Sequence, residues 1–337
     1  MTKSIWPTEL CEPVIISYNR AQELEKTLAA FAVLKDRNLV LHVLDNCSTD
    51  QTPTVVAKWQ QDWPGLRYHR NTYNIGGNAN ILRALELTHS AYAWVIGDDD
   101  VWHLDHIDEV INVLNAQQAD IIRLGWLIAP EFSGKNVLAT ELFQQESFFF
   151  ASVSMISATI VRRDVMTRHL NWAYQNICYA YPQLVPLIRT IQEQPMTVYS
   201  VNQPIITHTP SQEPGYFVGD LEWYVAWFRT ARFFKDFRQK KAFIAESVRY
   251  MIRPQHGKGR EFLWLFKVVL NAKAQGISQW QYLCELLAIG CGWRVRLIGL
   301  MALYVCVPKR LAWGLRRLYF YMSKKEWKEL QYDQTRL

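Results

Sequence analysis

The feature of this sequence that most restricts its fold is a repeated order of short apolar stretches and amphipathic stretches. Four apolar, largely β-branched stretches are typical of buried strands: residues 13–17, 39–44, 66–69 and 91–96. Between them, apolar side chains recur at helical spacing in residues 21–34, 54–61 and 79–87. Strands that alternate with helices through short connections predict an α/β fold, with a mainly parallel sheet sandwiched by helices.

Polar clusters lie at the ends of three of these predicted strands. They are Ser-Tyr-Asn-Arg at 17–20, Asp-Asn-Cys-Ser-Thr-Asp at 45–50 and three aspartates at 98–100. In a sheet of this kind, ligands bind in the crevice beyond the carboxyl ends of the strands. We therefore expect the three clusters to converge on one site.

The three consecutive aspartates, Asp98 to Asp100, repel one another unless a cation neutralises them. Carboxylates at the end of a buried strand suit an oxygen-seeking divalent ion such as Mg²⁺ or Mn²⁺. Taken alone, the same triplet is also compatible with a solvated acidic turn.

A glycine-containing segment precedes the helix predicted at 79–87. Asn74 and the pair Gly76-Gly77 leave backbone amides free to approach a diphosphate. An ordinary turn explains the glycine pair equally well.

Four of these segments, taken together, resemble the family 2 glycosyltransferases of GT-A fold. The family's opening strand resembles PVIISYNR at 13–20, and its Asp-Asp-x-Ser-Thr-Asp turn resembles DNCSTD at 45–50, with Asn46 in place of the second acid. Its Asn-x-Gly segment resembles NIGGNAN at 74–80, and its strand leading to the DxD motif resembles WVIGDDD at 94–100. The four segments also follow one another in the same order as in the family. The resemblance covers the first third of the chain well and the middle third weakly.

The resemblance implies an inverting hexosyl- or deoxyhexosyltransferase that uses a UDP or dTDP sugar in preference to a GDP sugar. Asp45 would contact the base, Asp98 the ribose, and Asp99 or Asp100 a Mn²⁺ or Mg²⁺ ion that bridges the diphosphate. A downstream histidine, His208, would complete the metal shell. The expected donor-binding residues are Ser17, Tyr18, Asn19, Arg20, Asp45, Asn46, Ser48, Asn74, Gly77, Asn80 and Asp98.

The chain departs from the family at the catalytic base. The family's Glu-Asp pair should follow residues 176–181, where this sequence has Tyr181-Pro182-Gln183. Candidates for the group that deprotonates the acceptor hydroxyl are Glu193, His208 and Asp220, with Glu222 nearby. Because this position is unsettled, a catalytically silent nucleotide-sugar-binding or scaffold protein is the alternative. A dehydrogenase is excluded, since no GxGxxG follows the first strand.

Length and helical patterning indicate that this chain of 337 residues contains more than one structural region. We expect a nucleotide-sugar-binding half at 1–110, an acceptor-side half at 111–220 and a helical region at 221–337, with helices at 221–250, 261–274 and 278–289. Six scattered cysteines and an N-terminal segment without an apolar signal run predict a reduced, cytoplasmic protein.

Basic charge is concentrated near the C-terminus. Residues 292–325 hold eight Lys or Arg and no acid, so the rest of the chain has a net charge of −2. This segment includes an apolar run at 297–307, too short to span a bilayer, and aromatic residues that follow it. The pattern predicts a peripheral contact with an anionic membrane at its inner face, and favours a lipid-linked glycan acceptor in bacterial surface polysaccharide or O-antigen synthesis. A buried helix hairpin or an oligomer contact is the alternative, and no nucleic-acid motif is present.

Overall fold

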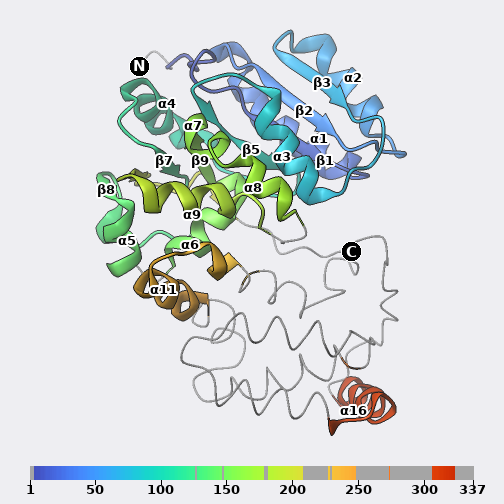
Figure 1. Ribbon diagram of the computed structural model, residues 1–337. Coiled ribbons are helices and arrows are strands. Elements are labelled where there is room, and N and C mark those ends of the chain that lie inside the picture. Colours follow the sequence, from blue (N-terminus) through green and yellow to red (C-terminus); the bar gives the residue numbers. More distant parts are fainter. Residues whose placement is uncertain are drawn as a thin grey trace. The chain divides into compact units, whose positions relative to one another are not determined.

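The computed structural model describes residues 4–125, 127–145, 148–177, 181–207, 227, 230–247, 273 and 306–322 (Figure 1). The chain divides into two compact units. The first comprises Met1–Ile177 and Tyr181–Pro210, and the second comprises Cys178–Ala180 and Ser211–Leu337. The division at 210/211 lies ten residues before the boundary predicted at 220/221.

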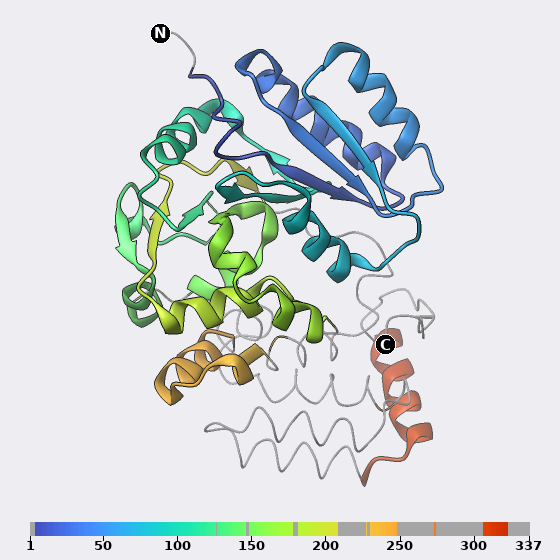
Figure 2. The ribbon, with the colours of Figure 1, turned by 45° about the horizontal axis from the view of Figure 1, so that its top comes forward.

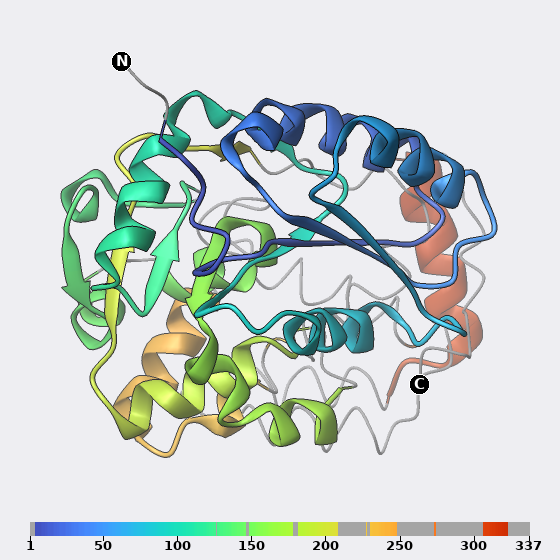
Figure 3. The same ribbon diagram turned by 90° about the horizontal axis from the view of Figure 1, so that it is seen from above.

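The first sheet of unit 1 is four-stranded and wholly parallel. Its order is β3 (Leu66–Arg70), β2 (Leu41–Asp45), β1 (Val14–Ser17) and β5 (Val95–Gly97). Helices α1 (Ala21–Phe31) and α2 (Thr52–Asp62) cover one face and α3 (Gly77–Leu87) covers the other (Figures 2 and 3). The predicted parallel sheet sandwiched by helices is therefore confirmed.

Helix α1 shows why these segments fold as the pattern predicts. Leu24, Leu28 and Phe31 recur at helical spacing and are all buried. The chain then tightens into the short helix η1 (Ala32–Arg37), which ends at Asn38 in the left-handed conformation, with φ 65°. Asparagine tolerates this conformation better than most residues, so the helix stops there and the chain turns toward β2.

The stretch predicted as one strand at 91–96 is two strands in different sheets. β4 (Tyr92–Ala93) pairs with β9 (Thr159–Arg162) of the second sheet, whereas β5 pairs with β1. Between them Trp94 is buried, and its indole N–H donates to the carbonyl of Ser157 at 2.9 Å. The prediction of a single strand was wrong because periodicity does not show which partner a strand will meet.

The second sheet of unit 1 is mixed and five-stranded, in the order β4-β9-β7-β10-β8. Its remaining strands are β7 (Ile121–Arg123), β8 (Asn136–Leu138) and β10 (Thr197–Ser200). The helices that accompany it are α4 (Ile107–Ala116), α5 (Ala139–Gln145), α6 (Phe149–Ser154), α7 (Arg163–Thr167), α8 (Leu170–Gln175) and α9 (Leu184–Glu193). A separate antiparallel pair joins β6 (Val101–Trp102) to β11 (Ile206–Thr207).

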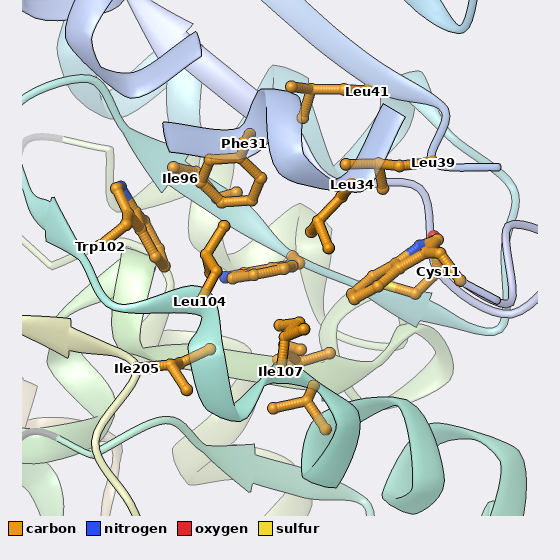
Figure 4. Close-up of a cluster of buried hydrophobic side chains, with 14 of the residues drawn as sticks. Cys11, Phe31, Leu34, Leu39, Leu41, Ile96, Trp102, Leu104, Ile107 and Ile205 are labelled. Carbon is orange, nitrogen blue, oxygen red and sulfur yellow. The ribbon is translucent and has the colours of Figure 1, made fainter. Parts of the chain in front are cut away.

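A hydrophobic core holds the first sheet against the elements that follow it. Phe31 of α1 meets the indole of Trp102 edge-on, with ring centroids 4.8 Å apart, and Trp94 meets Trp102 similarly at 5.6 Å. Around them lie aliphatic side chains from both ends of unit 1, including Leu41 and Ile205 (Figure 4). Burial on this scale fixes the strand ends that carry the polar clusters.

The described residues of unit 2 include α11 (Phe237–Ser247) and α16 (Lys309–Met322). Helix α11 falls within the helix predicted at 221–250. The helices predicted at 261–274 and 278–289 lie outside the described residues except for residue 273, as does the apolar run at 297–307 except for its last two residues. In the described part of the chain, none of the helices has the length and apolar character needed to cross a membrane.

Candidate active site

The carboxyl ends of β1, β2 and β5 meet at one edge of the parallel sheet. Ser17 pairs in register with Asp45, and Gly97 pairs with Ile16. The backbone N–H of Asn46 donates to the carbonyl of Ser17 at 2.9 Å, which continues the ladder past the end of β2. The three polar clusters therefore lie together.

Asp98, the first residue of the acidic triplet, is buried, with 4% of its surface exposed. The Ser17 hydroxyl donates to its Oδ2 at 2.6 Å, and the Arg20 guanidinium contacts its Oδ1 at 3.2 Å. Burial raises the pKa of Asp98 to about 7, even though Ser17 and Arg20 both lower it, and the neighbouring Asp99 raises it further. A buried carboxyl in this state is sensitive to any positive charge added next to it.

Asp99 and Asp100 lie side by side over the backbone of Gly97. A Cβ at position 97 would be 3.2 Å from Asp99 Oδ1 and 3.6 Å from Asp100 Oδ2, so glycine leaves space for both carboxylates. Arg20 binds Asp99 Oδ2 at 2.7 Å. Within the described ranges, no three His, Cys, Asp or Glu side chains are grouped so as to hold a metal ion. Mg²⁺-type ions in nucleotide sites use one or two carboxylates and complete their shell with phosphate oxygens and water, so two adjacent carboxylates fit such an ion.

Asp45 has no exposed surface, and its carboxylate is held by two hydrogen bonds and a salt bridge. The Ser48 backbone N–H binds Oδ1 at 2.8 Å, the Tyr68 hydroxyl binds Oδ2 at 2.6 Å, and Arg70 Nε lies 3.4 Å from Oδ2. Burial, together with the hydrogen bond to Asp45, raises the pKa of Tyr68, so this hydroxyl remains a donor at neutral pH. The contact with Arg70 is the longest of the three and the easiest to exchange for a ligand.

Two residues tie the first cluster to the second. Asn19, with a left-handed φ of 53°, accepts a hydrogen bond from the Thr49 backbone at 2.7 Å, while its own N–H donates to the Ser48 hydroxyl at 2.9 Å. Asp50 accepts from the backbone N–H groups of Ala21 and Thr52, both at 3.0 Å, and so caps α1 and α2 together. Burial opposes its ionisation, but these hydrogen bonds outweigh burial and lower the pKa of Asp50.

The segment between β3 and α3 is held by asparagine side chains. Asn46 is buried, with 2% of its surface exposed, and contacts Asn71, Asn74 and Ile75. Asn71 also donates to Asn80 at 2.8 Å. At the start of α3, Gly76 has a φ of 84°, and a Cβ added at Gly76 or Gly77 would meet none of the described residues within 4 Å. The start of α3 is therefore open to a ligand.

The candidate bases fall in different places. Gln183 is the last of the three residues at which the family's acid pair was expected, and it directly precedes α9. It is buried, and its Nε2 donates to the Ser154 carbonyl at 2.6 Å. Glu193 is the last residue of α9, ~14 Å along the helix from its start. Its carboxylate accepts a hydrogen bond from His169 Nε2 at 2.7 Å, a contact that favours a structural role. His208, Asp220 and Glu222 lie outside the described residues.

Sequence reasoning missed four side chains that hold the site. Tyr68 and Arg70 secure Asp45, the Thr27 hydroxyl donates to the backbone carbonyl of Asp98 at 2.9 Å, and the Ser157 hydroxyl accepts from Gly97 N–H at 2.8 Å. A signal existed for Arg70, because it ends β3 at the sheet edge where β2 ends in Asp45. Nothing in the sequence marks Ser157, which the short helix η4 (Ile156–Ala158) supplies from 60 residues away.

A sequence profile of the family described as "Glycosyl transferase family 2" matches residues 14–192 of the chain. Among curated proteins, the chain is similar to the abequosyltransferase RfbV of Salmonella typhimurium, with 32% identity over 110 residues, which are 32% of this chain and 33% of that protein. It is also similar to a GalNAc(5)-diNAcBac-PP-undecaprenol beta-1,3-glucosyltransferase of Campylobacter jejuni, with 24% identity over 147 residues, 42% of this chain and 48% of that protein. These matches span half or less of the curated relatives.

Among solved structures, S. aureus TarS 1-349 in complex with UDP-GlcNAc has the same fold. Its TM-score is 0.58 at 13% identity, and the match covers 96% of this chain and 97% of that chain. At this identity the likeness concerns the fold alone. Because the family profile matches more than half of the chain, the protein belongs to glycosyl transferase family 2.

Proposed function

We propose that this member of glycosyl transferase family 2 moves a hexose or deoxyhexose, with inversion, from a UDP or dTDP sugar to a glycan acceptor. The observation that carries the proposal is the junction at the ends of β1 and β5. There Ser17 and Arg20 bind Asp98, and Arg20 also binds Asp99 beside Asp100. One arginine and an acidic triplet at a sheet edge suit a ligand that brings both a diphosphate and a cation.

In this proposal the donor lies along the edge formed by residues 17–20, 45–48 and 74–80. Asp45 serves the base pocket together with Arg70. The Arg70 side chain lies beside the Asp45 carboxylate and is 46% exposed. Since Asp45 itself has no exposed surface, its carboxylate reaches a base only if the long contact with Arg70 exchanges. Asp98 serves the ribose, and the open start of α3 at Gly76 and Gly77 faces the diphosphate.

Asp99 and Asp100 are the proposed metal ligands, with His208 as a third. A bound Mn²⁺ or Mg²⁺ would neutralise the charge that develops on the leaving diphosphate. The register of β11 supports His208, because Thr207 pairs with Val101, the residue directly after Asp100. Arg20 holds Asp99 in place and offsets part of the charge of the triplet before the donor binds.

For the base that accepts the proton of the acceptor hydroxyl, His208, Asp220 and Glu193 remain the candidates. Three single variants separate them: His208→Ala, Asp220→Asn and Glu193→Gln. Loss of the base lowers kcat by roughly 10²–10⁴-fold, while donor affinity is retained. His208→Ala also weakens Mn²⁺ affinity if the side chain is a metal ligand, so a Mn²⁺ titration distinguishes its two roles.

The acceptor and the cellular process rest on the relatives. One relative's name specifies an abequosyltransferase and another's an undecaprenol-linked acceptor. We propose a lipid-linked acceptor in bacterial surface polysaccharide or O-antigen synthesis, at the inner face of the cytoplasmic membrane. In this proposal residues 1–110 bind the donor and residues 111–220 receive the acceptor.

The decisive experiment is a nucleotide-sugar panel with Mn²⁺ or Mg²⁺, read by release of the nucleoside diphosphate and, in parallel, by calorimetry. A transferase releases UDP or dTDP from one donor in an acceptor-dependent manner. A catalytically silent donor-binding protein binds a nucleotide sugar without turnover under the same conditions. Absence of binding to every nucleotide would contradict both functions.

Helix α16 supports the proposed contact with an anionic membrane. Three leucines recur at helical spacing and are exposed by 52%, 37% and 52%: Leu311, Leu315 and Leu318. Basic side chains of Lys309, Arg310 and Arg317 are also exposed, and Arg317 lies over the ring of Trp313, 5.7 Å from its centroid. Exposed leucines flanked by basic and aromatic residues are typical of interfacial helices.

Two triple variants test this contact in liposome pelleting with anionic vesicles. Replacing Lys309, Arg310 and Arg317 by Gln should remove the salt-sensitive part of binding, up to ~1 kcal/mol per residue. Replacing Leu311, Leu315 and Leu318 by Gln should remove the part that resists high salt. If both variants pellet like the wild type, the membrane contact lies elsewhere. Concentration-dependent dimerisation lost in the leucine variant would instead identify an oligomer contact.

A further inference from the structure

Position 46 is the point where this chain departs from the family's acidic turn, and its hydrogen bonds show what the asparagine does. Its Oδ1 accepts from the Ile75 backbone N–H and from Asn71 Nδ2, both at 3.0 Å. Its Nδ2 donates to Asn74 Oδ1 at 2.7 Å. Asn74 Oδ1 in turn accepts from the Gly76 backbone N–H at 2.9 Å.

Backbone N–H groups fix the orientation of both amides. A backbone N–H can only donate, so the atom of Asn46 that faces Ile75 and the atom of Asn74 that faces Gly76 must both be acceptors. The group of Asn46 that meets the Asn74 oxygen must then be a donor. Position 46 therefore has to accept and donate at once, which an amide does and an ionised carboxylate does not.

Besides these side-chain bonds, the segment is held by the Asn71 backbone N–H, which donates to the Asp45 carbonyl at 2.9 Å, and by the Cys47 thiol, which lies 3.4 Å from the Thr72 carbonyl. Tyr73 is 75% exposed and Ile75 is 44% exposed, so apolar burial contributes little to the conformation of residues 71–76. The network continues through Asn71 to Asn80 in the first turn of α3, and Asn80 Nδ2 reaches the Leu44 carbonyl at 3.4 Å. Asn46 thus connects the end of β2 with the start of α3.

We propose that Asn46 is a positioning residue, which sets the conformation of residues 71–76 and the start of α3 through Asn74 instead of contacting the donor itself. Its burial is consistent with this role, since 2% of its surface is exposed. The inference rests on the proposed function, in which this edge binds the nucleotide diphosphate. A neutral amide here also keeps a further negative charge away from that diphosphate.

The test compares two Asn→Asp substitutions that add the same charge to the same network. Asn46→Asp keeps the acceptor for Ile75 N–H but loses the donor to Asn74. Asn74→Asp keeps an acceptor for both Asn46 Nδ2 and Gly76 N–H, so it is the matched control. In the unliganded Asn46→Asp protein at pH 8, we expect the Gly76 backbone amide to exchange hydrogen at least tenfold faster than in the wild type. In Asn74→Asp, exchange at the Ile75 and Gly76 amides should stay within threefold of the wild type.

Two further variants complete the pattern. Asn46→Ala removes both functions, so Ile75 and Gly76 should both exchange faster. Asn74 lies on an exposed segment, and Asn74→Ala removes the oxygen that accepts from both Gly76 N–H and Asn46 Nδ2. Asn46 keeps its Oδ1 as the acceptor for Ile75 N–H, so Gly76 alone should exchange faster. If Asn46→Asp fails to fold, Asn74→Ala still decides the question. Unchanged exchange at Gly76 in Asn74→Ala would overturn the proposal.

Acidification provides a readout that a general packing defect would not show. A protonated carboxyl at position 46 can donate to Asn74 while accepting from Ile75, and this demand for the neutral form raises its pKa. Protection of Gly76, relative to the wild type at each pH, should therefore return in Asn46→Asp as pH falls from 8 to 5, and should not return in Asn46→Ala. The neighbouring charged groups are the same in every variant: Arg20, Asp45, Asp50, Arg70 and Asp98.

Binding of UDP and dTDP, measured by calorimetry at pH 8 and pH 5.5, connects the network to function. We expect Asn46→Asp to bind the preferred nucleotide about tenfold more weakly at pH 8 and to regain affinity, relative to the wild type, at pH 5.5. Wild-type affinity at pH 8 would refute the positioning role. A wild-type protein that binds neither nucleotide but shows the predicted exchange pattern would refute the proposed donor site and leave the network intact.

Discussion

The two acidic turns at the ends of β2 and β5, the neighbours of β1, differ in the groups that surround their first carboxylate. Asp45 is fully buried and has the Ser48 backbone, the Tyr68 hydroxyl and the Arg70 guanidinium around it. Asp98 is almost as buried, but two further carboxylates follow it directly, and its pKa is raised to about 7. The first turn supplies its own donors, whereas the second gathers negative charge around one arginine.

The difference separates a carboxylate whose partners all come from the protein from an acidic cluster that a cation would stabilise. A buried carboxylate with several donors is stable as an anion and fixes the turn around it. Three adjacent acids with one shared arginine have lower energy when a cation approaches. The turn after β5 is therefore the place where metal binding should change the protein most, and the turn after β2 is the place where a substitution should disturb the fold.

The largest effect should come from the turn after β5. Replacing Asp99 and Asp100 together by Asn removes the charge that would hold the cation, so metal-dependent turnover should fall by roughly 10³-fold or more, given the several kcal/mol that a metal supplies. The thermal midpoint should stay close to that of the wild type, because both side chains are partly exposed. Nucleotide release during a Mn²⁺ titration measures the effect. Full activity of the double variant in EDTA would refute the metal assignment.

The next effect concerns the pH dependence of the unliganded fold. The folded pKa of Asp98, about 7, lies above its ordinary value of 3.8, so its stabilising contribution is complete below pH 3.8 and is lost as pH rises through 7. This loss is up to roughly 4 kcal/mol between pH 4 and pH 8, by ~1.4 kcal/mol per pKa unit. Asp98→Asn should remove this slope. Urea unfolding of both proteins at several pH values gives the difference, and equal slopes would show that folding does not raise the pKa of Asp98.

A smaller effect should follow substitution in the turn after β2. Asp45→Ala leaves Tyr68 and the Ser48 N–H without their acceptor, at a cost of roughly 2–3 kcal/mol in the free energy of unfolding. Tyr68→Phe removes one donor and should cost about 1 kcal/mol. Calorimetry with UDP and dTDP should also show weaker binding for Asp45→Ala. If Asp45→Ala changed neither the free energy of unfolding nor the nucleotide affinity, Asp45 would neither stabilise the fold nor belong to the donor site.

The parallel sheet and the gathering of its polar strand ends could be predicted from local pattern. Period-2 and helical spacing are properties of neighbouring residues, and parallel strands necessarily bring their carboxyl ends to one edge. Ser17, Asp45 and Asp98 therefore come together as expected. The catalytic base could not be predicted in this way, because the resemblance places the family's Glu-Asp pair where this sequence has Tyr181-Pro182-Gln183.

The alternation of strands and helices in the first sheet, and the family to which the protein belongs, could be read from the sequence because they depend on periodicity and on motif order. The folded protein was needed to show that residues 92–97 divide between two sheets, that Tyr68 and Arg70 hold Asp45, and that position 46 both accepts and donates. The physical reason is that a hydrogen bond is specified by the partner's identity and direction as well as by the residue itself. Those partners come from segments distant in the chain, and folding alone brings them within 3 Å or so of one another.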